Sequence, residues 1–119
     1  MQTAIALFLI LLFFHYLADY PLQGPFLAQY KSSREDQSLF PWKHIMFAHA
    51  YIHAGFVGGA CWLLTGAWWL MFFELAAHFI IDKTKCEGKI NFVRDQWLHI
   101  GCKALWAVIA VLSVGVLNG

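Results

Sequence analysis

The chain has 119 residues, of which 61% are hydrophobic and 13% are charged, and its mean hydropathy is +0.59. Soluble domains carry about 25% charged residues, so this composition indicates a single membrane domain. The net charge of +1 leaves no basic face to neutralise phosphates, which excludes a nucleic-acid binder. The three cysteines form no CxxC pair, so we expect neither a disulfide framework nor a thiolate zinc site.

Four apolar segments are long enough, or nearly so, for the roughly 20 residues that a membrane-spanning helix needs. We expect these helices over residues 3–20, 42–64, 67–82 and 94–117. The first stops at Pro21, and it lacks the basic start and cleavage site of a signal peptide. Short connections make successive helices antiparallel neighbours. The expected fold is therefore all-α, an up-down four-helix membrane bundle in one domain.

Two polar connections lie at one end of this bundle. The first, over residues 22–41, contains the segment Gly24–Tyr30, which we expect to form a short interfacial helix because Pro25 stands near its start. The second is a basic loop over residues 83–92. Seven of the eight Lys and Arg residues lie in or beside these connections: Lys31, Arg34, Lys43, Lys83, Lys85, Lys89 and Arg94. The positive-inside rule predicts a multi-pass protein with both loops cytoplasmic and both termini outside.

Each expected helix carries ionisable residues four positions apart, which places them on one helix face. These nine residues, called the polar cluster below, are His15 and Asp19, His49 and His53, Glu74, His78 and Asp82, and Asp95 and His99. Up-down connectivity brings the four stripes together at the loop-side end of the bundle. Acids and histidines inside so apolar a chain are costly, so they indicate a functional site.

The register of the helices predicts layers within the polar cluster. Asp19, Asp82 and Asp95 form a rim with His49, and His15, His53, His78 and His99 lie one turn, about 6 Å, deeper. Glu74 is one turn below His78, and Lys103 is one turn below His99. We expect Glu74 and Lys103 to form a buried ion pair, because either charge alone in a bilayer would be costly.

A carboxylate layer above an imidazole layer suits zinc, iron, manganese or nickel. All nine residues of the polar cluster are candidate ligands, more than the four that one tetrahedral zinc ion needs. We therefore expect one or two divalent metal ions per chain, with zinc favoured. The alternative interpretation of any single membrane histidine is a hydrogen-bonded packing residue, and we prefer it for His44, which lies beside Lys43 at the expected interface.

Four stretches of the chain carry a family resemblance. HYLADYPLQ (His15–Gln23), HAYIH (His49–His53), ELAAHFIIDKTK (Glu74–Lys85) and DQWLH (Asp95–His99) together resemble the DUF3307 family. The resemblance covers almost the whole chain and implies a small inner-membrane protein of bacteria or their phages. It adds Gln23 as a candidate site residue, and it implies no activity. In architecture alone, the chain is also similar to bacterial membrane-bound metal-dependent hydrolases.

The ligand set favours an integral-membrane, metal-dependent hydrolase that acts on an ester or phosphoester at the cytoplasmic face. A bound metal ion lowers the pKa of its water towards ~7 and polarises the substrate oxygen. Apolar walls at an interface favour a lipid-linked substrate. The candidate catalytic carboxylates are Asp19, Asp95 and Glu74. Residues expected to orient ligands or bind substrate are Gln23, Lys83, Lys85, Gln96 and Lys103.

Three alternatives use the same residues. A di-iron oxidoreductase would differ in its metal. A metal or proton transporter would need polar residues up to the outer face, and the sequence beyond Glu74 and Lys103 is apolar, so it would require a homo-oligomer. A phage-encoded interaction protein would hold a structural metal, and it would lose its fold on metal removal without showing turnover.

Overall fold

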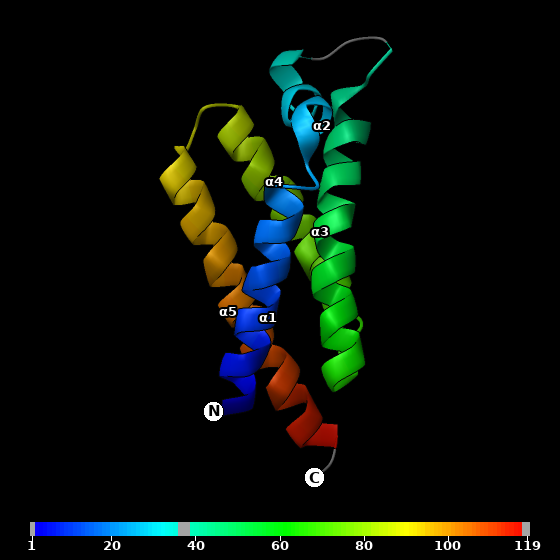
Figure 1. Ribbon diagram of the computed structural model, residues 1–119, viewed down its shortest axis with the longest axis vertical. Helices are drawn as coiled ribbons and strands as arrows, with labels where there is room; N and C mark the ends of the chain where they lie inside the picture. The colour runs from blue at the N-terminus through cyan, green and yellow to red at the C-terminus, as the bar shows by residue number, and fades with distance from the viewer. Residues whose placement is uncertain (1, 36–38, 118–119) are drawn as a thin grey trace.

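The computed structural model describes residues 2–35 and 39–117, and these form helices (Figure 1). The helices are α1 (Gln2–Asp19), α2 (Gly24–Tyr30), α3 (Trp42–Thr65), α4 (Leu70–Cys86) and α5 (Phe92–Leu117), with one 3-10 turn, η1 (Ser33–Glu35). No strand occurs in these two described segments, so the expectation of an all-α fold is confirmed. The short helix expected after the first long one is also present, as α2. Residues 36–38 of the first connection lie outside the described residues.

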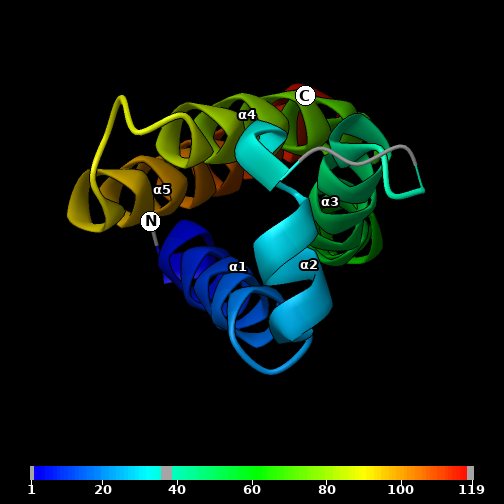
Figure 2. The same cartoon turned by 90° about the horizontal axis from the view of Figure 1, so that it is seen from above.

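The molecule measures 52 × 26 × 22 Å, and its four long helices run along the longest axis (Figure 1). They alternate in direction, and α1 and α4 each lie beside both α3 and α5. Helix α2 and η1 lie across one end of the four, next to α3 and α4 (Figure 2). The first and last described residues lie at the opposite end. We call residues 24–35, which comprise α2 and η1, the cap.

Helix α4 departs from its expected bounds at both ends. The sequence predicts residues 67–82, whereas the helix occupies Leu70–Cys86. It begins later because residues 66–69 form a turn of their own. It ends later because Lys83 and Lys85 continue the helix, where cations in the last turn interact favourably with the helix dipole. The expected basic loop is therefore shorter than predicted.

The other long helices lie within two residues of their expected bounds. Gly66 caps the end of helix α3, directly after Thr65. It adopts a left-handed φ of 79°, which glycine tolerates, and the Gly66 N–H donates to the Trp62 carbonyl at 2.8 Å. Helix α5 begins at Phe92 because Asn91 caps it, with Asn91 Oδ1 accepting from the Arg94 N–H at 2.8 Å.

Helices α3 and α4 approach each other closely at Gly58. A Cβ atom at this position would lie 2.4 Å from the Cβ of Met71, so only glycine fits. Nearer the cap, the imidazole rings of His53 on α3 and His78 on α4 stack with their centroids 3.7 Å apart. The close approach of the two backbones thus brings histidines of successive helices into contact.

The interior has an apolar part and a polar part. The apolar core includes Leu7, Leu11, Val57, Cys61, Leu70, Trp106 and Ala110. Beyond it, towards the cap, the polar cluster is buried together with smaller apolar patches that include Ala18, Met46 and Ala50. An apolar core at one end and ionisable groups at the other follow directly from the placement of the four stripes along the helices.

Three helices of the described chain, α1, α3 and α5, are long and apolar enough to cross a membrane. Helix α4 has 17 residues and carries charged side chains at Glu74, Asp82, Lys83 and Lys85. Large apolar side chains also cover the outward faces of the long helices, an arrangement that soluble monomers rarely show. Examples are Leu9, Phe13, Phe47, Trp62, Leu63, Phe72, Phe73, Ile80, Trp97 and Leu112.

Candidate metal centre

The polar cluster is buried where α1, α3, α4 and α5 meet. Eight of its nine residues are at most 1% exposed, and the side chain of Asp19 is 12% exposed. The i, i+4 spacing within each helix places successive stripe residues on the face that points inward. The four stripes thus meet at one end of the helices, as the sequence predicts.

Asp19, at the end of α1, faces histidines of two helices. Its Oδ1 lies 3.0 Å from His53 Nε2 and 3.6 Å from His49 Nε2. Its Oδ2 lies 3.5 Å from His15 Nε2 and accepts a hydrogen bond from Gln96 Nε2 at 3.1 Å. The carboxylate therefore connects α1 to α3 and α5.

Asp82, near the end of α4, also has four partners, and one of them belongs to the cap. Its Oδ1 lies 3.0 Å from His99 Nε2, and its Oδ2 lies 3.1 Å from His49 Nε2 and 3.7 Å from His78 Nε2. The Oδ2 atom also accepts a hydrogen bond from Lys31 Nζ at 2.5 Å. Asp82 therefore joins three long helices and the cap.

Asp95, in the first turn of α5, completes the rim. Its Oδ1 lies 3.3 Å from His99 Nε2, and its Oδ2 accepts a hydrogen bond from Gln96 Nε2 at 3.1 Å. Lys85 Nζ lies 3.9 Å from the same Oδ2. Gln96 also reaches His15, whose Nε2 lies 3.2 Å from Gln96 Oε1. The amide of Gln96 thus links two of the rim carboxylates, Asp19 and Asp95, to His15 in the deeper histidine layer.

Lys31 belongs to the site, although the sequence indicates only a loop residue. It is 4% exposed, and its Nζ donates to Gln23 Oε1 at 2.6 Å and lies 3.3 Å from His49 Nε2, besides its contact with Asp82. Among residues 24–35, all of them described, Lys31 is the only buried side chain. It therefore anchors the cap to the cluster. No periodicity in the sequence could have shown this, because the cap is too short to have a repeating pattern.

The expected ion pair beneath the site is confirmed. Lys103 Nζ lies 2.6 Å from Glu74 Oε1, and both side chains are at most 1% exposed. Trp106, which sequence reasoning missed, donates from Nε1 to Glu74 Oε2 at 2.7 Å. Its position three residues after Lys103, on the same face of α5, was the available signal. Both oxygens of the Glu74 carboxylate are thus occupied within the protein.

Lys83, which the sequence predicts as a substrate-binding residue, makes its contact away from the cluster. Lys83 donates to Glu87 Oε1 at 2.5 Å, and Lys89 Nζ lies 2.8 Å from Glu87 Oε2. These contacts lower the pKa of the Glu87 carboxyl to about 2. Lys83 is therefore engaged at the end of α4 instead of at the site. His44 is exposed, in keeping with its interpretation as an interfacial residue.

Three groups of side chains in the described residues bring potential ligand atoms within 4.8 Å of one another. The four-donor group is Asp19, His49, His53 and His78, the three-donor group is Asp82, Asp95 and His99, and a bridging group consists of His15, His78 and His99. The first two share no residue, so they could each hold an ion. The bridging group would compete with both.

The distances within these groups fit a common central ion. Ligand atoms bonded to a tetrahedral zinc ion at about 2.0–2.1 Å lie about 3.3 Å from each other. His49 Nε2 and His78 Nε2 are 3.2 Å apart, and His99 Nε2 is 3.0 and 3.3 Å from its two carboxylate neighbours. Among the buried atoms that lack a hydrogen-bond partner within the described chain are two of these ligand atoms, His53 Nε2 and Asp95 Oδ1. Each is close to another ligand atom, but not in hydrogen-bond geometry.

The buried charges of the site do not balance. Four carboxylates face two ammonium groups, those of Lys31 and Lys103, which leaves two negative charges when the imidazoles are neutral. Uncompensated charge in a low-dielectric interior is strongly unfavourable. One divalent cation supplies the missing charge, so the residues present fit a metal ion in charge as well as in donor type.

The chain belongs to the DUF3307 family. The family model described as "Protein of unknown function (DUF3307)" matches residues 7–117, which include every residue of the polar cluster. No curated protein and no protein of solved structure matches the chain. The family match therefore supports the identification made from the motifs and leaves the activity to be inferred from the site.

We expect the Glu74–Lys103 pair to be essential for stability. Glu74→Gln or Lys103→Met leaves one buried charge unpaired, which should lower the free energy of unfolding in detergent micelles by about 3–5 kcal/mol. The double variant should lose much less than the sum of the two, because no lone charge remains. Lys83→Met, which removes an exposed cation from the same helix as Glu74, serves as the control and should change stability little. Additive losses would contradict the pairing.

We expect Lys31→Met to release the cap. Loss of a hydrogen bond to a charged partner should increase hydrogen exchange of α2 amides by roughly tenfold or more, while exchange in the long helices stays unchanged. The measurement is hydrogen–deuterium exchange by mass spectrometry. Lys43→Met, an exposed lysine at the start of α3, is the control. Equal exchange of α2 in both variants would show that the cap is held by other contacts.

Proposed function

We propose that this member of the DUF3307 family is an integral membrane protein that binds one or two divalent metal ions in the polar cluster and hydrolyses a lipid-linked ester or phosphoester. The observation that carries the proposal is the convergence of two disjoint ligand groups from four helices around an unbalanced negative charge. Zinc is the favoured metal, because imidazole and carboxylate donors suit it.

The membrane placement rests on the apolar outward faces and on the three helices that are long enough to span. In this proposal α4 is the fourth span. Its charged residues Glu74 and Asp82 are covered by the other helices instead of by lipid. The cap and the Lys83–Lys89 region, which carry most of the cations, face the cytoplasm. The setting is a bacterial inner membrane.

The two ligand groups suggest different tasks. Four protein donors complete a tetrahedral site, which is typical of a tightly held metal ion. Three protein donors leave a coordination position open, which is typical of a catalytic ion. We therefore assign the chemistry to the three-donor group and a supporting or structural role to the four-donor group.

The protein side chains then have separate roles in hydrolysis. A divalent ion at the three-donor group supplies Lewis-acid chemistry. Asp19, the most exposed carboxylate of the cluster, would ligate through Oδ1, which faces His53, and is placed to accept a proton from the attacking water through Oδ2. Gln96 holds Asp19 and Asp95 in position through its amide nitrogen. Glu74 has both oxygens engaged by Lys103 and Trp106 and lies beneath His78, with its Oε1 3.5 Å from His78 Nδ1, so it does not reach substrate.

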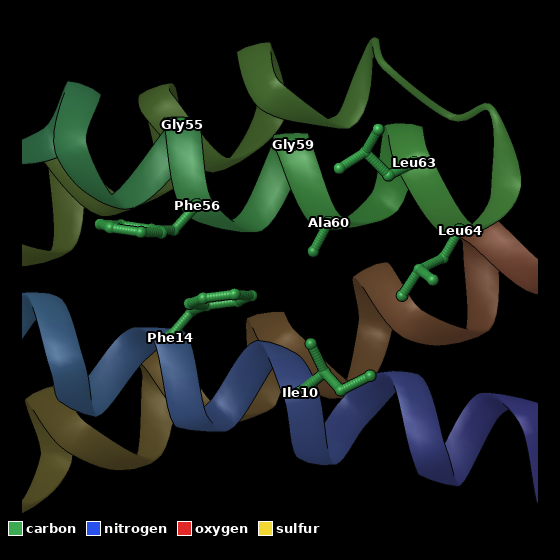
Figure 3. Close-up of a pocket in the computed structure, with 8 residues that line it drawn as sticks. All are labelled: Ile10, Phe14, Gly55, Phe56, Gly59, Ala60, Leu63 and Leu64. Atoms are coloured by element: carbon green, nitrogen blue, oxygen red, sulfur yellow. The ribbon is translucent and has the colours of Figure 1, made fainter.

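An apolar groove supports a lipid-linked substrate. It has a volume of about 330 Å³ and lies between α1 and α3 (Figure 3). Its lining consists of Ile10, Phe14, Gly55, Phe56, Gly59, Ala60, Leu63 and Leu64. Phe14 adjoins His15 in the sequence, and Leu64 lies near the far end of α3, so the groove runs from the level of the cluster into the apolar half. An acyl chain placed there would bring its headgroup towards the cap end.

Transport by a single chain is disfavoured by the apolar core. Below Glu74 and Lys103, Leu11, Val57 and Leu70 are at most 3% exposed and close the interior between the long helices. An ion or proton would meet no polar partner among these described residues. A di-iron oxidoreductase would use the same ligands, and the identity of the bound metal distinguishes it from the hydrolase.

Elemental analysis of the detergent-purified protein tests the proposal. We expect one or two equivalents of zinc in the wild type and none in the double variant His78→Ala/His99→Ala. His53→Ala removes a donor from the four-donor group alone, and Asp95→Ala removes one from the three-donor group alone. With two ions bound, each single variant should lose one. With one ion bound, the ion should be lost only from the variant whose substitution lies in the group that holds it.

His44→Ala, which removes an exposed histidine, should keep the full metal content. The metal-loaded wild type should also hydrolyse phosphoesters or lipid esters, lose this activity on chelation and regain it when zinc is restored. Iron in place of zinc would favour the oxidoreductase. A folded wild-type protein without any metal would overturn the proposal.

Gly59→Leu tests the groove. The position has open space around it, so a leucine should fill the groove without disturbing the helices. A phospholipid with a diazirine in its acyl chain should crosslink to the groove residues of the wild type, and Gly59→Leu should reduce these adducts several-fold. Gly101→Leu, an equally open position on α5, is the matched control. Adducts spread evenly over all outward faces, and unchanged in Gly59→Leu, would exclude an acyl site here.

A further inference from the structure

Two lysines, Lys31 and Lys85, flank the three-donor group and are not needed to hold a metal ion. We infer that their ammonium groups bind a phosphoryl group, so that the substrate is a phosphoester and not a neutral carboxylic ester. This inference rests on the proposed function, since it requires a divalent ion at the three-donor group.

Lys31 reaches this group from the cap. Its Nζ contacts Asp82 Oδ2, which belongs to one of the three donors, and its other close partners are neutral, namely Gln23 Oε1 at 2.6 Å and His49 Nε2 at 3.3 Å. With its side chain only 5% exposed, Lys31 requires an anionic partner. When Asp82 ligates a divalent ion, that ion neutralises the carboxylate. The buried ammonium group then lacks an anion.

Lys85 lies beside the other carboxylate of the same group. Its Nζ is 3.9 Å from Asp95 Oδ2, and its side chain is 30% exposed, so it is open to solvent on one side. It follows Asp82 by three residues on α4, which puts both on one helix face. Cations from two different elements thus stand next to the two carboxylates of one ligand group.

The local charges specify the ligand. A divalent ion balances Asp82 and Asp95, and Lys103 balances Glu74, so Lys31 and Lys85 face only the one negative charge of Asp19 and one positive charge is left. A phosphoester carries at least one negative charge at neutral pH, which compensates this excess. Lysine binds phosphate as a point charge, and ammonium groups aimed at phosphoryl oxygens stabilise charge in the transition state.

A neutral carboxylic ester fits the same site poorly. It carries no charge to compensate the two lysines, and the buried Lys31 would lose its anionic partner on metal binding without gaining another. The phosphoryl group can belong to a lipid headgroup or to a soluble phosphoester, and the chemistry of recognition is shared by both.

Isothermal titration calorimetry with inorganic phosphate tests the inference on the full-length protein in detergent. We expect phosphate to bind the zinc-loaded protein and not the metal-free protein. Lys31→Gln and Lys85→Gln should each weaken phosphate binding by about tenfold, the effect of losing one charge-assisted contact. Lys31→Arg, which keeps the positive charge, should retain most of the affinity.

Lys89→Gln is the matched control, because this lysine is 68% exposed and contacts Glu87. Lys31→Gln could weaken phosphate binding simply by releasing the cap. Lys85 does not hold the cap, so a loss of phosphate affinity in Lys85→Gln reports phosphate recognition itself. Zinc-loaded protein in nanodiscs of phosphatidylcholine, with and without phosphatidic acid, distinguishes the sources. Competition of phosphatidic acid with phosphate indicates a lipid headgroup, and its absence indicates a soluble phosphoester.

The inference and the proposed function can fail separately. A protein that holds zinc and cleaves neutral esters, but binds phosphate no better than Lys31→Gln does, would overturn the inference and keep the hydrolase. Equal phosphate affinity in the Lys31, Lys85 and Lys89 variants would also overturn it. A protein without metal would overturn the proposed function itself, and metal content is therefore measured on every sample first.

Discussion

The structure depends on the compensation of charge that is buried among apolar helices. Four carboxylates are enclosed at one end of the molecule, and each contacts imidazoles, ammonium groups or an amide contributed by another element. Two of the compensating cations, Lys31 and Lys103, come from opposite directions, one from the cap and one from within α5. The remaining negative charge is costly in the protein interior, and this cost is what the proposed metal ion would offset.

Much of the site was predictable because helical spacing is a strong signal. The four stripes, their meeting at one end and the Glu74–Lys103 pair all follow from residues three or four positions apart on antiparallel helices. The bounds of α1, α3 and α5 followed from proline, glycine and hydropathy. The prediction was wrong at both ends of α4: residues 67–69 belong to a turn, and Lys83 and Lys85, which look like loop residues by charge, form the last helical turn.

Lys31 shows where such reasoning stops. Its burial depends on how the cap folds back over α3 and α4, and this is a tertiary contact with no counterpart in the local sequence. Trp106 is an intermediate case, since its spacing from Lys103 was visible but its indole N–H bond to Glu74 was not. The role of the polar cluster as a metal centre remains a prediction, although its distances and charge fit one.

The connectivity of the two ligand groups has a consequence for biogenesis. All three donors of the three-donor group lie on the last helical hairpin, α4 and α5, so a short stretch of chain suffices to assemble it. The four-donor group instead needs α1, α3 and α4, and it must close a much longer loop, which costs more conformational entropy. In the proposed metal centre, the donors on α1 and α3 would therefore lack their fourth partner until α4 is synthesised. Metal loading of that group would then report that the two halves of the chain have assembled.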